Sequence, residues 1–284
     1  MEKVIITNSL GESLTFSHKP PLLLKSIDGT GSTEVSVQMQ KSPYQDGQSY
    51  VDSLLEPRVI PITAEIKSKD VYKLRSTISK VLNPKLGVGT LTYFRGTDVK
   101  EIPFVVEQPP SFPSGTDNKG RTFQLVLFTL ICPNPYWLDI DQITEPLIAW
   151  IGEFKFPLSL PTTMGRKGDS VTMINKGDVP TPVFITFNGP SDSPVVINHT
   201  TGEFIKINRQ LGDGEKIEIN TQFGNKKVEI VRQNGERINA FNWIDLDSTF
   251  FQLQVGANEL EYTALSGTIN ANVQVSWKNR YIGL

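Results

Sequence analysis

The sequence is poor in the residues that carry most enzyme chemistry. Its 284 residues include one cysteine and two histidines. A single cysteine excludes an internal disulfide, and it leaves a metal or redox centre without thiol partners. Catalysis near neutral pH depends on groups that titrate there, of which histidine is the usual one. The composition therefore argues against an enzyme before any motif is considered.

Neither sign of charge dominates, and no long apolar run is present. The 28 basic residues face 30 acidic ones, whereas a nucleic-acid-binding surface needs clustered excess Lys and Arg. We therefore expect no sequence-specific nucleic-acid binding. No stretch approaches the roughly 20 apolar residues of a membrane helix, and the first residues lack the apolar segment of a signal peptide. We expect no membrane span and assembly in a cytoplasm.

What the sequence does contain is material for packed cores and turns. Hydrophobic residues make up 38%, with four Trp and fifteen Phe, while 22 Gly and 19 Pro are spread without forming a low-complexity tract. A chain of this length is typically divided into two domains. The composition predicts a globular, turn-rich protein of two domains.

The first half reads as strands with one inserted helix. Val35–Gln40 alternates apolar and polar residues, which predicts a strand with one face buried and the other wet or at an interface. The run 122–131 is apolar on both faces and is typical of a central strand. Val71, Leu74, Ile78 and Val81 recur at helical spacing, with Asp70 as the expected cap. We expect a first domain over residues 1–140.

The second half has short strands separated by turn signals every 8–12 residues. Asn234-Gly235 is the strongest of these hairpin signals. Such evenly spaced strands predict a β-sandwich or jelly roll over residues 161–284. Between the domains, over residues 141–160, we expect a linker with a short helix, capped by Thr144 with Pro146 in its first turn. The predicted fold class is all-β with an α insertion.

The sequence motifs of common enzymes are absent. Nucleophile-elbow, zinc-protease and phosphate-loop patterns do not occur. His18 lies in a loop-like stretch and His199 beside a turn, so each is expected to be a surface polar residue rather than a general base. Cys132 precedes a proline at a strand end, and a buried apolar role is favoured over a thiol nucleophile.

Paired carboxylates are the remaining catalytic candidates. Asp245 with Asp247, and Glu259 with Glu261, have i, i+2 spacing on expected strands, so each pair projects from one face and could serve a glycosidase. A solvated sheet face near a turn is the favoured interpretation of both pairs. Asp178 and Asp213 follow or precede glycines in turns, where Asp suits the turn geometry. We expect no catalytic, cofactor or metal site.

Sugar binding through an exposed aromatic ring is a second reading of the later half. Jelly rolls often stack sugars on aromatic side chains, and Trp243 and Trp277 both lie there. Trp277 alternates with Val273 and Val275, which favours core packing. Trp243 lies between apolar residues and could face either way. The question of a carbohydrate-binding module contacting cell-wall glycans therefore rests on Trp243.

Several stretches together resemble the siphovirus distal tail protein family. The strand that ends in Cys132-Pro-Asn-Pro-Tyr-Trp137 resembles the close of that family's N-terminal belt domain. Later segments resemble its C-terminal galectin-like jelly roll. The stretches that carry the resemblance, in order, are residues 83–93, 123–137, 168–182, 198–202, 250–253 and 275–284.

The resemblance implies a structural and non-enzymatic role. The N-terminal half would be a β-sandwich with a helix that assembles into a hexameric ring of identical copies, and the C-terminal half a galectin-like domain outside the ring. Expected partners are the tail tube protein, a tail-associated lysin or tip protein, and the receptor-binding protein, with host cell-wall carbohydrate as a further possibility. The location would be the tail tip or baseplate of the virion. Strands such as 35–40 could form the contacts between ring subunits.

Overall fold

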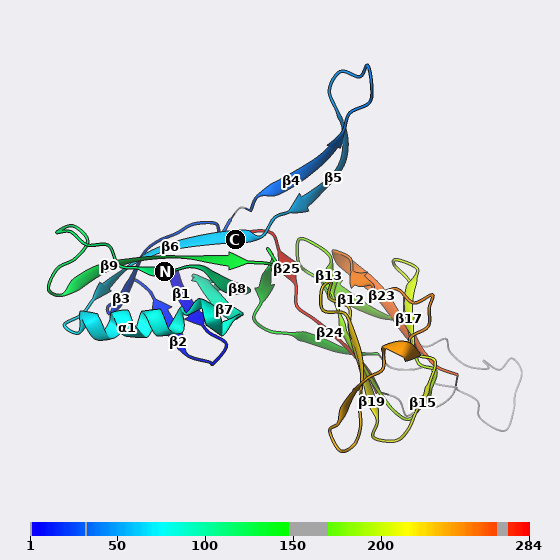
Figure 1. The fold of residues 1–284 in the computed structure, drawn as a ribbon. Coiled ribbons are helices and arrows are strands. Elements are labelled where there is room, and N and C mark those ends of the chain that lie inside the picture. The colour runs from blue at the N-terminus through cyan, green and yellow to red at the C-terminus, as the bar shows by residue number, and fades with distance from the viewer. Residues whose placement is uncertain (1, 32, 148–169, 266–271) are drawn as a thin grey trace, which may run out of the picture. The chain divides into compact units, whose positions relative to one another are not determined.

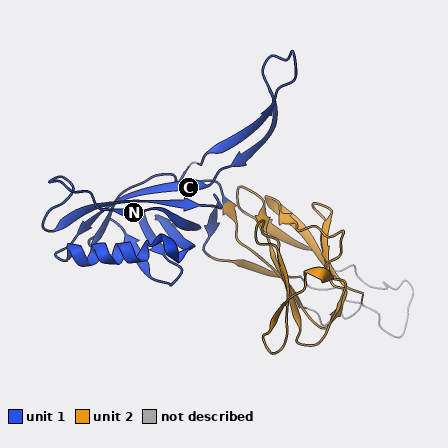
Figure 2. Cartoon of the chain, viewed as in Figure 1, with its two compact units in different colours: residues 1–140, 281–284 blue, residues 141–280 orange. Residues whose placement is uncertain are grey.

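The chain folds into two compact units. The computed structural model describes residues 2–31, 33–147, 170–265 and 272–284. Unit 1 contains residues 1–140 together with 281–284, and unit 2 contains residues 141–280 (Figure 2). Unit 2 is thus an insertion between two parts of unit 1. The last four residues, which the sequence places in the second domain, belong to unit 1.

Unit 1 is built on one nine-stranded sheet in which β2-β1-β7-β8-β9-β6-β3 are successive neighbours. Its strands are β1 (Glu2–Thr7), β2 (Ser13–Phe16), β3 (Leu22–Ile27), β6 (Arg58–Lys67), β7 (Gly89–Arg95), β8 (Asp98–Ser111), β9 (Phe123–Cys132), β10 (Trp137–Asp139) and β25 (Arg280–Tyr281). The sheet curves until its two edge strands, β2 and β3, meet. The evidence is the bridge between Ser17, just after β2, and Leu23 in β3. The expected sandwich is therefore realised as a single curved sheet, and in both cases each strand turns one face to a shared core.

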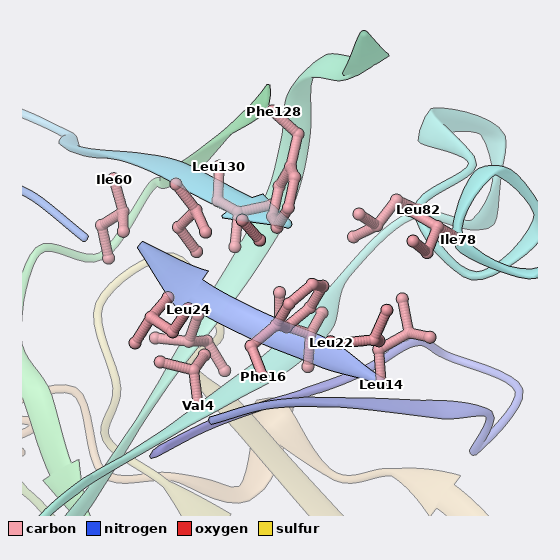
Figure 3. Packing of buried hydrophobic residues seen from close by; sticks show 14 of the residues in the cluster. Val4, Leu14, Phe16, Leu22, Leu24, Ile60, Ile78, Leu82, Phe128 and Leu130 are labelled. Carbon is pink, nitrogen blue, oxygen red and sulfur yellow. The ribbon is translucent and has the colours of Figure 1, made fainter. Parts of the chain in front are cut away.

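The core of unit 1 follows the two-residue period of these strands. In β6 every second residue, from Arg58 to Ile66, is buried, and in β9 the even-numbered residues are buried. As expected, β9 is a central strand, between β8 and β6. Figure 3 shows side chains from β1, β2, β3, β6 and β9 meeting in one cluster, joined by Ile78 and Leu82.

The predicted helix is present as α1 (Val71–Val81), with Val71, Ile78 and Val81 buried. Asp70 occupies the N-cap position, but its side chain makes no capping hydrogen bond. Asn83 follows the helix and caps the short 3₁₀ helix η1 (Pro84–Leu86) by accepting a hydrogen bond from the Lys85 N–H. The stop signal at Asn83-Pro84 therefore works as expected, whereas the start of the helix is set by packing.

Unit 2 is a two-layer β structure, which agrees with the predicted sandwich or jelly roll. A six-stranded sheet has the order β11-β24-β14-β19-β20-β21, and a four-stranded sheet the order β12-β23-β16-β17. Their strands are β11 (Ile143–Leu147), β12 (Val171–Asn175), β14 (Phe184–Asn188), β16 (Val195–Asn198), β17 (Glu203–Lys206), β19 (Lys216–Asn220), β20 (Lys227–Val231), β21 (Arg237–Asn239), β23 (Gly256–Thr263) and β24 (Asn272–Trp277). Short pairs complete it: β13 (Thr181–Pro182) with β22 (Gln252–Leu253), and β15 (Ser191–Asp192) with β18 (Gln210–Leu211).

The expected helix near residue 144 is not formed where the structure describes the chain. Thr144 and Pro146 lie in β11, which pairs antiparallel with β24. The edge of the six-stranded sheet offers hydrogen-bond partners to every second residue, and these outweigh a weak local helix signal. The rest of the expected linker, residues 148–160, lies outside the described residues.

Candidate assembly surface

A two-stranded hairpin, β4 (Val35–Gln40) with β5 (Ser49–Leu55), is the most unusual part of unit 1. Its strands pair with each other and with no other described strand, and they extend away from the curved sheet (Figure 1). No residue of either strand is buried. The period-two pattern predicted a strand with one buried face. The strand is present, but the face has no cover among the described residues.

A β-bulge places Tyr50 in place of Val51 opposite Met39, while Leu54 projects from the other face of the hairpin. Val35 pairs with Leu55, and the register shifts after Gln38 so that Met39 pairs with Tyr50. Without the shift, Tyr50 would project from the polar face, because side chains alternate along a strand. The apolar face, as we define it, consists of Val35, Val37, Met39, Tyr50 and Leu55, with Ser53 opposite Val37 between them.

Such a hairpin is not a stable structure by itself in water. Isolated two-stranded hairpins are marginal because they bury too little apolar surface to offset the entropy of ordering the chain. Val37 is 46% exposed and Met39 55%, although β-branched and long apolar side chains favour burial. A contiguous apolar face of this kind marks a protein–protein contact.

The base of the hairpin is held firmly. The Glu56 N–H donates to the Glu34 carbonyl at 3.0 Å, and the Thr33 hydroxyl donates to the Glu56 carbonyl at 3.2 Å. Gly29, just before the hairpin, has φ of +78°, and a Cβ there would lie 2.2 Å from the Val59 carbonyl oxygen. Only glycine fits this close approach of two backbones.

A fully buried guanidinium organises this base. Arg58, the first residue of β6, is 0% exposed. Its Nε donates to the Pro135 carbonyl at 2.8 Å, and its Nη atoms donate to the carbonyls of Gly29, Thr30 and Ile282. Burial lowers the pKa of Arg58 from its usual value, but a guanidinium remains charged at neutral pH. One side chain thus binds the segment before the hairpin, the loop after β9 and the C-terminal residues.

The last residues of the chain are fastened at the same place. The Leu284 N–H and the Trp137 indole N–H both donate to the Thr30 carbonyl, at 3.2 and 3.0 Å. A Cβ on Gly283 would lie 2.3 Å from the Gly31 carbonyl oxygen, so the two glycines permit close backbone contact. These bonds explain why residues 281–284 belong to unit 1.

The histidines are separated from each other and from catalytic partners. His18 is exposed in the turn after β2. His199 is also exposed, with its Nε2 2.6 Å from a carboxylate oxygen of Glu261. That contact joins neighbouring strands of an open sheet face, with no nucleophile or described pocket beside it. Both histidines are surface residues, as expected.

The two carboxylate pairs have different structures. Glu259 and Glu261 lie on β23 and share its outer face, as predicted. Asp245, expected on a strand, lies in a loop instead, where it accepts hydrogen bonds from the Asp247 N–H and the Asn208 side chain. These bonds, with Lys206 nearby, lower the pKa of Asp245. An acceptor tied into a turn in this way stabilises the loop, and it is poorly placed to act as an acid.

The remaining polar candidates have structural roles. Cys132 is buried at the end of β9, and burial raises the pKa of its thiol to about 12, which leaves it unreactive. Asp178 and Asp213 both lie in bends or turns. In the described ranges no group of three or more His, Cys, Asp or Glu side chains could hold a metal ion.

The two described tryptophans of unit 2, Trp243 and Trp277, do not present a free ring face. Trp277 is 3% exposed and lies in the core, as expected. Trp243, in the 3₁₀ helix η2 (Phe241–Trp243), packs against that core. The Arg209 guanidinium lies over its ring, 3.8 Å from the centroid. A sugar would have to displace Arg209 in order to stack on the indole.

The sequence predicts residues 35–40 as a strand, with a contact role that stays a prediction, but no prediction was made for Arg58. A signal was available, since Arg58 is in phase with Ile60, Ile62, Ala64 and Ile66, the buried positions of β6. An arginine at a core position indicates a buried guanidinium that needs several acceptors.

Comparison with known proteins agrees with this architecture. A model of the phage tail protein RIFT-related domain matches residues 9–132, and one of the siphovirus-type tail component, C-terminal domain, matches residues 176–281. A search of curated protein sequences found no match. Within the described residues no helix is both long and apolar enough to cross a membrane.

Solved structures share the fold over nearly the whole chain. The crystal structure of SPP1 Dit (gp 19.1), described as a paradigm of the hub adsorption apparatus in phages infecting Gram-positive bacteria, has a TM-score of 0.68, with 13% identity over 98% of each chain. Chains from the phage p2 baseplate in its activated conformation, with calcium or strontium, have TM-scores of 0.56 and 0.57, with 13% and 12% identity over 100% of each chain.

These matches define the class as a two-domain phage tail component. The chain belongs to the siphovirus distal tail protein family, and it is a structural component of the virion.

Proposed function

We propose that this protein forms a homohexameric ring at the end of the phage tail. The ring would join the tail tube to the tip and anchor the proteins that recognise the host. The observation that carries the proposal is the uncovered apolar face of the β4–β5 hairpin, which needs a protein partner to be stable. A repeated contact between unlike surfaces of identical copies closes into a ring when the rotation fits.

The protein would act by binding, without a catalytic step. The candidate acids, bases and thiol are each engaged in turns or the core or isolated on a strand surface. The proposed partners are the tail tube protein, a tail-associated lysin or tip protein, and the receptor-binding protein. Family membership supports these partners.

The test is the assembly state of the purified full-length protein and of tails that carry it. We expect closed rings by electron microscopy and a hexamer mass by light scattering, either for the free protein or after its incorporation into tails. A protein that remains monomeric and never enters tail particles would contradict the proposal.

A further inference from the structure

The chain passes between the two units twice, and the fold of unit 2 holds the two connections together. Unit 2 begins at Asp141 and ends at Arg280. Near its beginning, β11 pairs antiparallel with β24 near its end, so that Ile143 lies opposite Trp277. The two ends of unit 2 are therefore neighbours. Folding of unit 2 thus brings the segment after Arg280 to the place where the chain left unit 1.

The residue that follows Arg280 is fixed at once in unit 1. The Tyr281 hydroxyl donates to a carboxylate oxygen of Asp139 at 3.3 Å. The Lys100 ammonium lies 4.5 Å from the centroid of the Tyr281 ring and pairs with Asp139 at 3.1 Å, and both contacts are stabilising. Arg280 is held in unit 2, where its carbonyl accepts the Asp178 N–H at 2.8 Å. Consecutive residues are thus anchored in different units.

Residues 281–284, which we call the strap, end at the base of the β4–β5 hairpin. The Ile282 carbonyl accepts a hydrogen bond from the Arg58 guanidinium, and the Leu284 N–H donates to the Thr30 carbonyl. The Leu284 side chain also packs against the core of unit 1. The hairpin base is therefore built from segments that lie on both sides of unit 2 in the chain.

We propose that unit 2 seats the strap, so that the base of the β4–β5 hairpin is completed only when unit 2 has folded. The hairpin precedes unit 2 in the chain, and the strap follows it. With unit 2 folded, the strap begins beside its site. With unit 2 unfolded, the strap would lie at the end of the long loop 141–280. Closing that loop instead of a few residues lowers the local concentration of the strap about a hundredfold.

Loss of the strap would reach the hairpin through Arg58. This guanidinium is fully buried, and without the Ile282 carbonyl it lacks one of its acceptors. It also binds the carbonyls of Gly29 and Thr30, just before the hairpin. A hairpin with little stability of its own loosens when its base does. This coupling is a property of a single chain and goes beyond the proposed ring, in which a copy with unfolded unit 2 would lack a finished hairpin base.

Two alanine substitutions at one glycine–glycine contact test the strap. A Cβ on Gly283 would overlap the Gly31 carbonyl oxygen, so Gly283→Ala displaces the strap. A Cβ on Gly31 would lie 3.7 Å from the Leu284 carbonyl oxygen, which is an ordinary contact. In hydrogen exchange of the full-length proteins, the Glu56 N–H, bonded to the Glu34 carbonyl, should exchange at least about tenfold faster in Gly283→Ala. Gly31→Ala should match the wild type.

A core variant of unit 2 tests the dependence on its folding. Phe187 is fully buried in unit 2, and Phe187→Ala leaves a cavity that destabilises this unit. The Glu56 N–H should exchange faster in this variant too, starting at a temperature that falls together with the unfolding midpoint of unit 2 in calorimetry. The matched control is Phe223→Ala, because Phe223 is 86% exposed, and its exchange at Glu56 should equal that of the wild type.

Wild-type exchange at Glu56 in Gly283→Ala or in Phe187→Ala would overturn the inference, as would an equal rise in either control. Exchange is measured on the single chain, so such a failure would leave the ring proposal standing. Absence of rings in the wild-type protein would count against the ring proposal alone.

Discussion

Replacing Arg58 by methionine removes the buried donor at the base of the hairpin while keeping an apolar stem of similar length. The carbonyls of Gly29, Pro135 and Ile282 lose the hydrogen bonds that Arg58 donates to them. The Thr30 carbonyl keeps the indole N–H of Trp137 as a donor. The Pro135 carbonyl is buried, and a buried acceptor that loses its donor costs about 1–3 kcal/mol. The bonds to Gly29 and Ile282 are only partly buried, so their loss costs less.

Part of that loss is recovered, because the charged guanidinium no longer has to be held away from water. With one buried and two partly buried carbonyls, we expect a net destabilisation of unit 1 by about 2–3 kcal/mol. For a unit of this size, that lowers the midpoint of thermal unfolding by about 10 °C. The C-terminal residues should also become more accessible to carboxypeptidase, since Ile282 is one of the groups released.

Differential scanning calorimetry of the full-length protein measures this effect. The transition of unit 1 should shift, and that of unit 2 should not. Arg95→Met is the matched control, because Arg95 is largely exposed and lies 3.9 Å from Asp98, so its loss should cost less than about 0.5 kcal/mol. A stability loss for Arg58→Met within about 1 kcal/mol of wild type would refute the role assigned to the guanidinium.

Three further outcomes follow from unit 2 and the core. Burial alone would raise the pKa of Glu218, but hydrogen bonds from Lys216 and Arg237 outweigh it and lower that pKa below 4.5. The stabilisation that the ionised Glu218 carboxylate gives is therefore present above pH 4.5 and is lost as pH falls through the lowered pKa. In thermal unfolding from pH 7 to pH 3, Glu218→Gln should be less stable at pH 7 and should lose less stability on acidification, and an unchanged slope would contradict this. Cys132 should resist a thiol reagent until the protein is denatured, whereas reaction at native rates would show that it is accessible. Trp243→Ala should lower the unfolding temperature of unit 2 without changing retention on host cell walls; loss of retention with unchanged stability would favour a sugar-binding surface.

Much of the fold follows from local patterns in the sequence. The helix at residues 71–81 was predictable because its apolar residues recur at helical spacing and Pro84 stops it. The evenly spaced turns of the second half likewise indicated a layered β structure. Local signals failed for residues 143–147, where an available sheet edge converted an expected helix into β11.

The sequence predicted only part of the apolar face of the β4–β5 hairpin. Alternation in Val35–Gln40 correctly predicted a strand. It could not show that no described residue would cover either face, because burial depends on where distant strands lie. The bulge that moves Tyr50 to the apolar face also depends on the pairing register, which is not fixed by the composition of either strand.

The sequence by itself determined the strand and helix pattern, the absence of enzyme motifs and, through resemblance, the family. These depend on the order of residues within short segments, which is complete in a single chain. Only the tertiary structure decided that Arg58 joins three distant segments, that Arg209 covers Trp243, and that the chain ends in unit 1. Such contacts join residues far apart in the chain, and they exist only after the sheets have formed.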